Sequence, residues 1–112
     1  MSGYDPSRSK TNPDVLANFI KAPLTGDLQE VPGIGPKTVE LLEGEKISTT
    51  FALLGKFLML KEAGVESVEH CDRFWYWLES IGAPAGYRGA IVQAIARKLD
   101  ASYPGMYDAS KY

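Results

Sequence analysis

Apolar and polar residues alternate along this chain with the three- to four-residue spacing of amphipathic helices, and short stretches rich in glycine and proline separate them. The pattern predicts helices over residues 13–21, 27–31, 36–43, 50–62, 66–81 and 85–101. No segment shows the two-residue alternation that is typical of a half-buried strand. The sequence therefore predicts an all-α fold in one compact domain of five to six helices.

Two flanking segments lack this periodicity. Residues 1–12 are polar and predict a flexible N-terminal arm, and residues 102–112 predict a mobile or loosely docked C-terminal tail. The folded domain is then expected to cover residues 13–101. Arg8 and Lys10 lie in the arm among hydroxyl residues. They are either part of a solvated tail or contacts to phosphate, which phosphorylation of the arm would release.

The connection before the helix at 36–43 has the most informative sequence, Val-Pro-Gly-Ile-Gly-Pro-Lys-Thr from Val31 to Thr38. Gly33 and Gly35 can adopt backbone angles closed to other residues and leave room for a close approach. Ile34 is expected to fill the space between the flanking helices. The pattern is typical of a helix-hairpin-helix, which binds a nucleic-acid phosphate through main-chain N–H groups.

The residues after the turn fit the same interpretation. Pro36 suits the first position of a helix, where its missing N–H costs nothing. The N–H groups of Gly35, Lys37 and Thr38 are then expected to face an anion at a helix N-terminus, with the Lys37 charge beside them. A nucleotide-hydrolase phosphate loop is excluded by Pro36, and a dinucleotide fingerprint lacks its third glycine and its strand. The alternative is a plain turn between helices without a ligand.

The predicted helix that follows Thr49 is apolar nearly all round, which indicates burial on two sides. A domain of this size has one core to cover one side, so the sequence predicts a homodimer. The expected interface residues lie on one stripe of the helix: Phe51, Leu54, Gly55 and Leu58. The alternative is a central helix enclosed within one monomer.

Charge argues against a broad basic DNA-binding groove, because the formal net charge is −2. Residues 61–80 carry five acidic and two basic side chains, whereas residues 1–37 carry four of each. The acidic surplus is therefore expected on a face away from the turn. A small number of phosphate contacts then predicts a shallow dependence of binding on salt.

The sequence offers little chemistry for catalysis. The single histidine, His70, and the single cysteine, Cys71, are adjacent, and neighbours on a helix point in different directions. We therefore expect no enzyme activity, no metal site and no cofactor. The lone thiol is typical of a reducing compartment, nucleus or cytoplasm. No apolar run approaches the ~20 residues needed to cross a bilayer, so no membrane insertion is expected.

Three segments between about Val15 and Leu99 carry a resemblance to a known family. The first is the turn with its flanking residues, from Leu28 to Leu42. The second is Ala-Leu-Leu-Gly-Lys-Phe-Leu-Met-Leu-Lys over residues 52–61, and the third is Phe-Trp-Tyr-Trp-Leu over residues 74–78. Together they resemble the barrier-to-autointegration factor family, which has a similar Leu-Gly-x-Phe-Leu-x-Leu-Lys run and a Phe-x-x-Trp-Leu segment.

The resemblance implies a SAM-like helical domain that binds double-stranded DNA without sequence preference. It implies that Arg88 supports the DNA contact, and that Leu54, Gly55 and Leu58 lie at the dimer interface. It also implies that one dimer bridges two duplexes and accepts a small protein domain in its groove. The chain differs from the family at Glu40 and Glu43, where the family's hairpin helix carries lysines.

Three functions follow from these observations. The first is a non-enzymatic, sequence-independent protein that dimerises and bridges double-stranded DNA in chromatin or genome organisation. The second is a protein-interaction adaptor that keeps the turn only as a scaffold, which the acidic balance favours. The third is the DNA-holding domain of a larger nuclease, whose catalytic residues would come from another subunit.

Overall fold

The computed structural model of the protein describes residues 3–9 and 11–112, which form five α-helices and three short 3-10 helices with no strand among them. In chain order these elements are η1 (Pro6–Arg8), α1 (Pro13–Lys21), η2 (Leu28–Glu30), α2 (Pro36–Gly44), α3 (Thr50–Met59), α4 (Ser67–Ser80), α5 (Ala85–Ser102) and η3 (Ala109–Lys111). The predicted all-α class is confirmed, and α1 has the predicted bounds.

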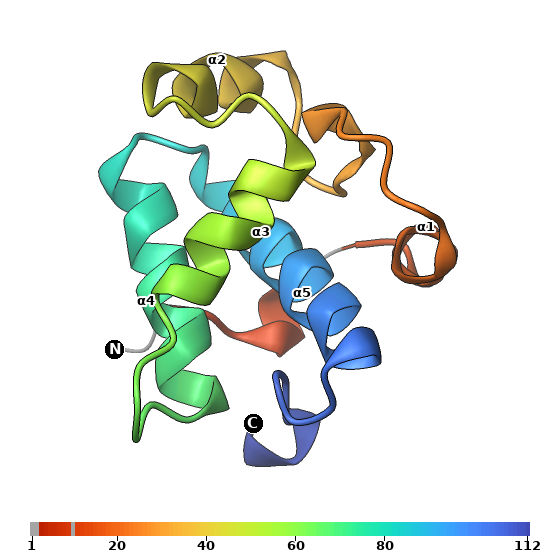
Figure 1. Ribbon diagram of the computed structural model, residues 1–112, viewed down its shortest axis with the longest axis vertical. Helices are drawn as coiled ribbons and strands as arrows, with labels where there is room; N and C mark the ends of the chain where they lie inside the picture. The colour runs from red at the N-terminus through yellow and green to blue at the C-terminus, as the bar shows by residue number, and fades with distance from the viewer. Residues whose placement is uncertain (1–2, 10) are drawn as a thin grey trace.

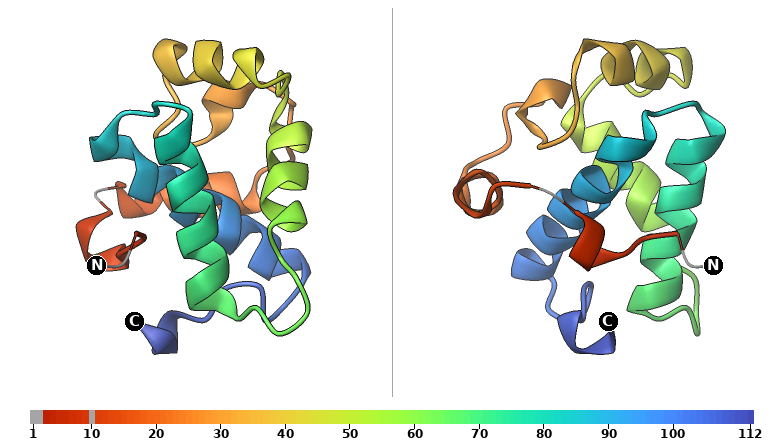
Figure 2. Two further views of the ribbon diagram at one scale, coloured as in Figure 1. Left: turned by 90° about the vertical axis from the view of Figure 1, so that its left-hand side faces the viewer. Right: turned by 180° about the vertical axis from the view of Figure 1, so that it is seen from behind.

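Helix α5 runs through the middle of the fold and packs against α1, α3 and α4 (Figure 1). Figure 2 shows the other helices arranged around it. Five consecutive or near-consecutive residues of α5 are fully buried: Ile91, Val92, Ala94, Ile95 and Ala96. Phe57 of α3 and Phe74 of α4 complete this core. Their rings pack edge to face, with 5.1 Å between the ring centres. Burial of these apolar side chains is the main stabilisation of the fold.

Helix α1 is fixed to α5 by a lysine. The Lys98 ammonium of α5 donates hydrogen bonds to the main-chain oxygens of Phe19, Ile20 and Ala22, at 2.7, 3.1 and 2.6 Å. The last carbonyls of a helix have no partner within it, and a cation there also suits the helix dipole. The other end of α1 is capped by Asn12, whose side-chain oxygen accepts from the Asp14 N–H at 2.8 Å.

The first helix of the predicted hairpin is a single 3-10 turn, η2, instead of an α-helix over residues 27–31. Asp27 caps it by accepting from the Gln29 N–H at 2.9 Å. Pro32 follows without an N–H to donate, and Gly33 has a φ of +94°. The chain therefore turns away before a helix can extend.

Helix α3 ends at Met59 rather than near Glu62. The N–H groups of Leu60 and Lys61 bond back to Phe57 and Leu58 in tighter turns, and Gly64 has a φ of +84° in the connection that follows. Helix α3 has an exposed apolar face. Its predicted interface residues are exposed to different degrees: Phe51 is 56% exposed, Leu58 is 39% exposed, and Leu54 and Gly55 are partly exposed.

Both terminal segments contact the domain, where the sequence predicted a flexible arm and a mobile or loosely docked tail. Tyr4 is 1% exposed and Tyr107 is 8% exposed, and their hydroxyls are hydrogen-bonded at 3.0 Å. The Tyr4 N–H also donates to the Asp72 carboxylate of α4 at 2.8 Å. Buried aromatic area and paired hydroxyls hold these segments in place. Tyr4 and Tyr107 therefore attach both segments to the domain.

Candidate functional site

The turn between η2 and α2 is held firmly against the rest of the fold. The Ile34 side chain is buried in the core, and its N–H donates to the Val31 carbonyl at 3.0 Å. Upstream, the Glu30 carboxylate accepts from the Gly26 N–H at 3.0 Å and from the Thr50 hydroxyl at 2.7 Å. Ile34 was predicted among the DNA-contacting residues, yet neither its side chain nor its N–H is open. Its role in the structure is to anchor the turn.

Gly33 is required by the turn itself. Its φ of +94° lies in the left-handed region that side chains disfavour. A Cβ at this position would lie 3.1 Å from the Tyr87 carbonyl oxygen, and 3.1 Å from atoms of Ala90 and Ile91. The absence of a side chain at Gly33 therefore lets the turn lie directly against the first turns of α5.

Gly35 is different, because nothing in the protein requires a glycine there. Its φ of −106° and ψ of −174° are open to any residue, and no atom would lie within 4 Å of an added Cβ. It is the N-cap of α2 but contributes no side-chain hydrogen bond, although serine, threonine, aspartate and asparagine are preferred at such positions. No protein atom therefore fills the space next to Gly35 in front of the α2 N-terminus.

The main-chain donors around Gly35 are only partly available. Among the described residues, no hydrogen bond is formed by the N–H groups of Gly35 and Lys37. Gly35 is partly exposed and Lys37 is exposed, so both predicted contacts lie at the surface. Thr38 is only 2% exposed, so little of it can touch a ligand. Two main-chain N–H groups without a partner among the described residues thus lie at the start of α2, in residues that are at least partly exposed.

The start of α5 lies beside the start of α2. A cavity of about 370 Å³ is lined by residues 33–38 of the turn together with Pro84 and Tyr87. Gly86, in the first turn of α5, likewise has no atom within 4 Å of an added Cβ. Two helix N-termini, each with a positive dipole end, therefore converge on one hollow. Tyr87 was not among the predicted site residues, because only the fold places it beside the turn.

Arg88 is held inside the protein instead of at the surface where a phosphate contact was predicted. Its Nε donates to the Ala83 oxygen at 2.8 Å, and its guanidinium lies 3.6 Å from the Glu79 carboxylate and 5.1 Å from the centre of the Trp75 ring. The side chain is 14% exposed. These contacts fix the turn between α4 and α5, and they leave Arg88 little access to a ligand.

Arg8 lies on the other side of the α5 N-terminus. It is exposed and lines a cavity of about 300 Å³ together with Gly86 and Gly89 of α5. The neighbouring Ser9 hydroxyl donates to the Gln93 side-chain oxygen at 2.8 Å, which holds η1 on α5. The predicted contact Lys10 lies outside the described residues.

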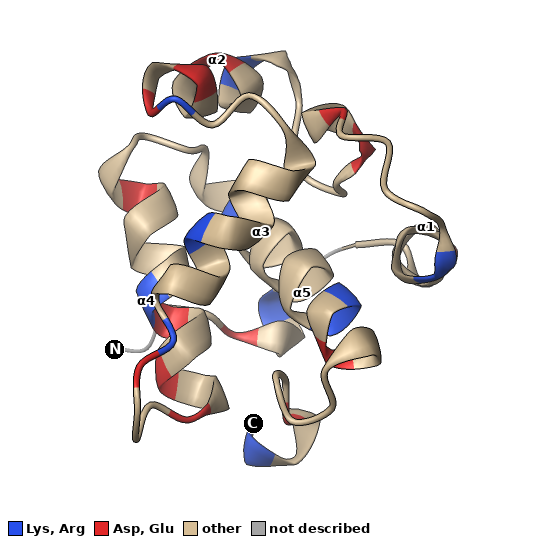
Figure 3. Ribbon diagram, in the orientation of Figure 1, with Lys and Arg blue, Asp and Glu red and all other residues tan. Residues whose placement is uncertain are grey.

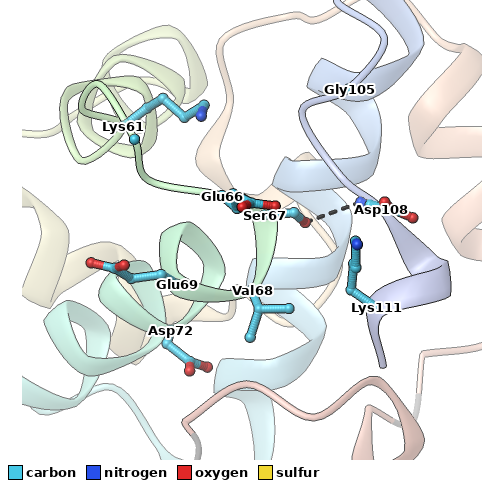
Figure 4. Close-up of a pocket in the computed structure, with 10 residues that line it drawn as sticks. Lys61, Glu66, Ser67, Val68, Glu69, Asp72, Gly105, Asp108 and Lys111 are labelled. Atoms are coloured by element: carbon cyan, nitrogen blue, oxygen red, sulfur yellow. Dashed lines mark hydrogen bonds between the residues drawn. The ribbon is translucent and has the colours of Figure 1, made fainter.

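Acidic residues lie on α2 itself, at Glu40 and Glu43, as well as farther from the turn. Figure 3 shows both signs of charge on the visible face, with acidic residues on α2 and on the N-terminal part of α4. A cavity of about 580 Å³ at that end of α4 is lined by four carboxylates, from Glu66, Glu69, Asp72 and Asp108, and by two lysines (Figure 4). The Asp108 N–H donates to the Ser67 hydroxyl at 3.0 Å and joins the C-terminal segment to this helix. This cavity does not suit an anion.

Within the described part of the chain, no three histidine, cysteine, aspartate or glutamate side chains are grouped as a metal ion would require. Of the helices described, none is both long and apolar enough to cross a bilayer. No protein-family model, curated protein or solved structure matches this chain.

Proposed function

We propose that the protein binds the phosphate backbone of double-stranded DNA without sequence preference, and that it acts by binding rather than by catalysis. In this proposal the segment from η2 to α2 is a helix-hairpin-helix within a SAM-like domain, as the resemblance implies. A phosphate oxygen accepts from the N–H groups of Gly35 and Lys37, and the Lys37 ammonium neutralises its charge. Contacts to phosphate position a protein on a duplex but carry no sequence information.

The observation that carries the proposal is the open space at Gly35. A protein that needed this turn only as a connection would gain from serine or aspartate at the N-cap, because either would satisfy free N–H groups of α2. Gly35 leaves those groups unpaired and leaves room for another backbone to approach. Lys37 and the nearby α5 N-terminus add positive potential at the same hollow.

We further propose that two copies associate through the open face of α3. Phe51 and Leu58 are exposed there, and Met59 is 76% exposed. Exposed apolar side chains grouped on one helix mark an interaction surface. Gly55 has no atom within 4 Å of an added Cβ, so a partner helix can approach closely. A dimer carries two hairpins and can bridge two duplexes.

The test is a pair of charge-matched substitutions on one helix. In Gly35→Asp the new carboxylate caps α2, accepts from the free N–H groups and repels phosphate. Gly44→Asp adds the same charge at the far end of α2, where an added Cβ also meets no atom. We expect Gly35→Asp to stay folded by circular dichroism and to lose roughly tenfold or more in affinity for a short blunt duplex, measured by fluorescence anisotropy.

Gly44→Asp is expected to bind nearly as well as the original protein. Equal affinity of the two variants would overturn the proposal, because it would show that the hairpin amides do not touch DNA. The adaptor function would be favoured instead if the original protein bound no duplex at moderate salt.

A further inference from the structure

We infer that the site prefers DNA with an unpaired base next to the bound phosphate, such as a strand extension or a gap, over an intact duplex. This inference rests on the proposed function and specifies its substrate. It is carried by an apolar cavity that adjoins the phosphate hollow and by one tyrosine that the two share.

The apolar cavity lies between α1, the turn and the start of α5. Its volume is about 500 Å³, and its lining includes Val15, Pro32, Tyr87 and Ala90. Val15 is 50% exposed and Tyr87 is 58% exposed, so the walls present large apolar groups to solvent. Small-molecule sites are concave and mostly apolar, with volumes of roughly 300–1,000 Å³. The cavity therefore has the size and the character to hold a flat aromatic ring.

The cavity adjoins the phosphate hollow. Gly33 and Tyr87 line both spaces, so the tyrosine stands between the free amides and the apolar walls. A nucleotide has the same two parts, a charged phosphate and an apolar base. A strand with its phosphate at Gly35 and Lys37 can therefore place an adjoining base against Tyr87.

Base pairing decides which DNA can use the cavity. In an intact duplex each base is stacked on its neighbours, and only an unpaired base can expose a face to a side chain. Stacking of a base on an aromatic side chain strengthens binding by roughly five- to a hundredfold, and it tolerates every base. The inference therefore predicts a preference for unpaired structure without a preference for sequence.

The test compares three DNAs that share one duplex: the blunt duplex, the duplex with a short single-stranded extension, and the duplex with an abasic extension of equal length. The abasic strand has the same phosphates but no bases, so it separates stacking from charge. We expect the protein to bind the base-containing extension roughly five- to a hundredfold more tightly than the abasic one. A 2-aminopurine in the extension should lose fluorescence as it stacks, and a free mononucleotide should compete only weakly.

Three variants test whether Tyr87 is responsible for the preference for the base-containing extension. Tyr87→Ala should lose the preference for the base-containing extension, and Tyr87→Phe should keep it because the ring remains. Tyr103→Ala is the matched control, since Tyr103 is 60% exposed at the far end of α5. Both positions are exposed, so the thermal unfolding of all three variants should differ little from that of the original protein.

Equal affinity for the two extensions, or a preference that survives Tyr87→Ala, would overturn the inference while leaving the proposed function intact. Binding of no DNA at all would overturn both. The two failures are thus distinguishable in one titration series.

Discussion

Gly33 and Tyr87 approach each other so closely that a Cβ on Gly33 would lie 3.1 Å from the Tyr87 main-chain oxygen. This contact joins the turn to α5 and places the two helix N-termini around one hollow. Gly35, two residues further on, makes no comparable contact. One glycine is therefore required by the fold, and the other is available for binding.

The first prediction separates these two roles by stability. Gly33→Ala places a side chain at a positive φ and against α5, so it should lower the free energy of unfolding by about 1–3 kcal/mol. Gly35→Ala should change it by no more than about 1 kcal/mol, because the backbone angles suit alanine and the space is open. Urea titration followed by tryptophan fluorescence measures both values. Similar losses for the two variants would contradict the assignment.

The second prediction concerns the tyrosine pair that joins the two ends of the chain. Removing either hydroxyl, in Tyr4→Phe or Tyr107→Phe, leaves the other buried without this partner. Each variant should lose about 1 kcal/mol of stability, and the double variant should lose less than the sum of the two. Tyr103→Phe, at an exposed tyrosine, serves as the control. Additive losses would show that the two hydroxyls act independently.

Local features of the fold were predictable from the sequence. Asn12 before Pro13 marks the start of α1, and the structure has the predicted bounds. Gly33 was expected at a special backbone position, and its positive φ confirms this. Caps, prolines and glycines act over a few residues, so sequence patterns report them reliably.

Contacts between distant residues could not be predicted in this way. Periodicity did not reveal that Tyr4 meets Tyr107, or that Lys98 reaches the carbonyls at the end of α1. The resemblance implied that Arg88 supports the DNA contact, but the structure pairs its side chain with the Ala83 oxygen and the Glu79 carboxylate. Tyr87 became a site residue only when the fold placed it beside the turn. Such placements depend on tertiary packing, which a local pattern does not contain.

The third prediction is a loss of stability in mild acid, caused by His70. This side chain is fully buried, stacks on the Phe57 ring at 3.9 Å and bonds through Nε2 to the Phe57 oxygen at 2.7 Å. Its Nδ1 is buried without a partner among the described residues. Burial lowers the pKa of His70 below its ordinary 6.5, and the nearby charges of Lys61 and Arg73 lower it further, although the bond to Phe57 opposes them.

The direction of the effect follows from proton counts. Below pH 6.5 the unfolded chain binds a proton at His70 that the folded protein does not, so stability falls as the pH falls from there toward the lowered pKa. Glu30 does not produce this effect. Burial raises the pKa of Glu30, but its hydrogen bonds lower it by more, so the pKa lies below the ordinary value of 4.5. The stability that Glu30 contributes is therefore lost only below about pH 4.5. His70→Gln keeps a donor for the Phe57 oxygen and should flatten the melting temperature between about pH 7 and pH 5. If the melting temperature of His70→Gln changed with pH as steeply as that of the original protein, another titratable group would cause the loss of stability in acid.

The fourth prediction tests association through α3. Leu58→Arg places a charge in the open apolar face, so it should give monomers in light scattering where the original protein gives dimers. The monomer should bind one duplex through its intact turn but should no longer hold two duplexes together in a pull-down. Tyr103→Arg introduces the same charge at an exposed residue away from α3. A monomeric original protein would remove the bridging function.

The fifth prediction concerns the salt dependence of DNA binding. Each lysine that neutralises a phosphate contributes about 0.9 to the slope of log affinity against log salt. Lys37→Ala should therefore weaken binding to every duplex sequence alike and reduce the magnitude of the slope by about one per binding site. Lys111→Ala, beside the acidic cavity, removes the same charge and should leave the slope unchanged. If the slope of log affinity against log salt stayed steep in Lys37→Ala, a basic surface outside the turn would have to bind the DNA. If the slope fell equally in Lys37→Ala and Lys111→Ala, the effect would come from net charge and not from a contact at Lys37.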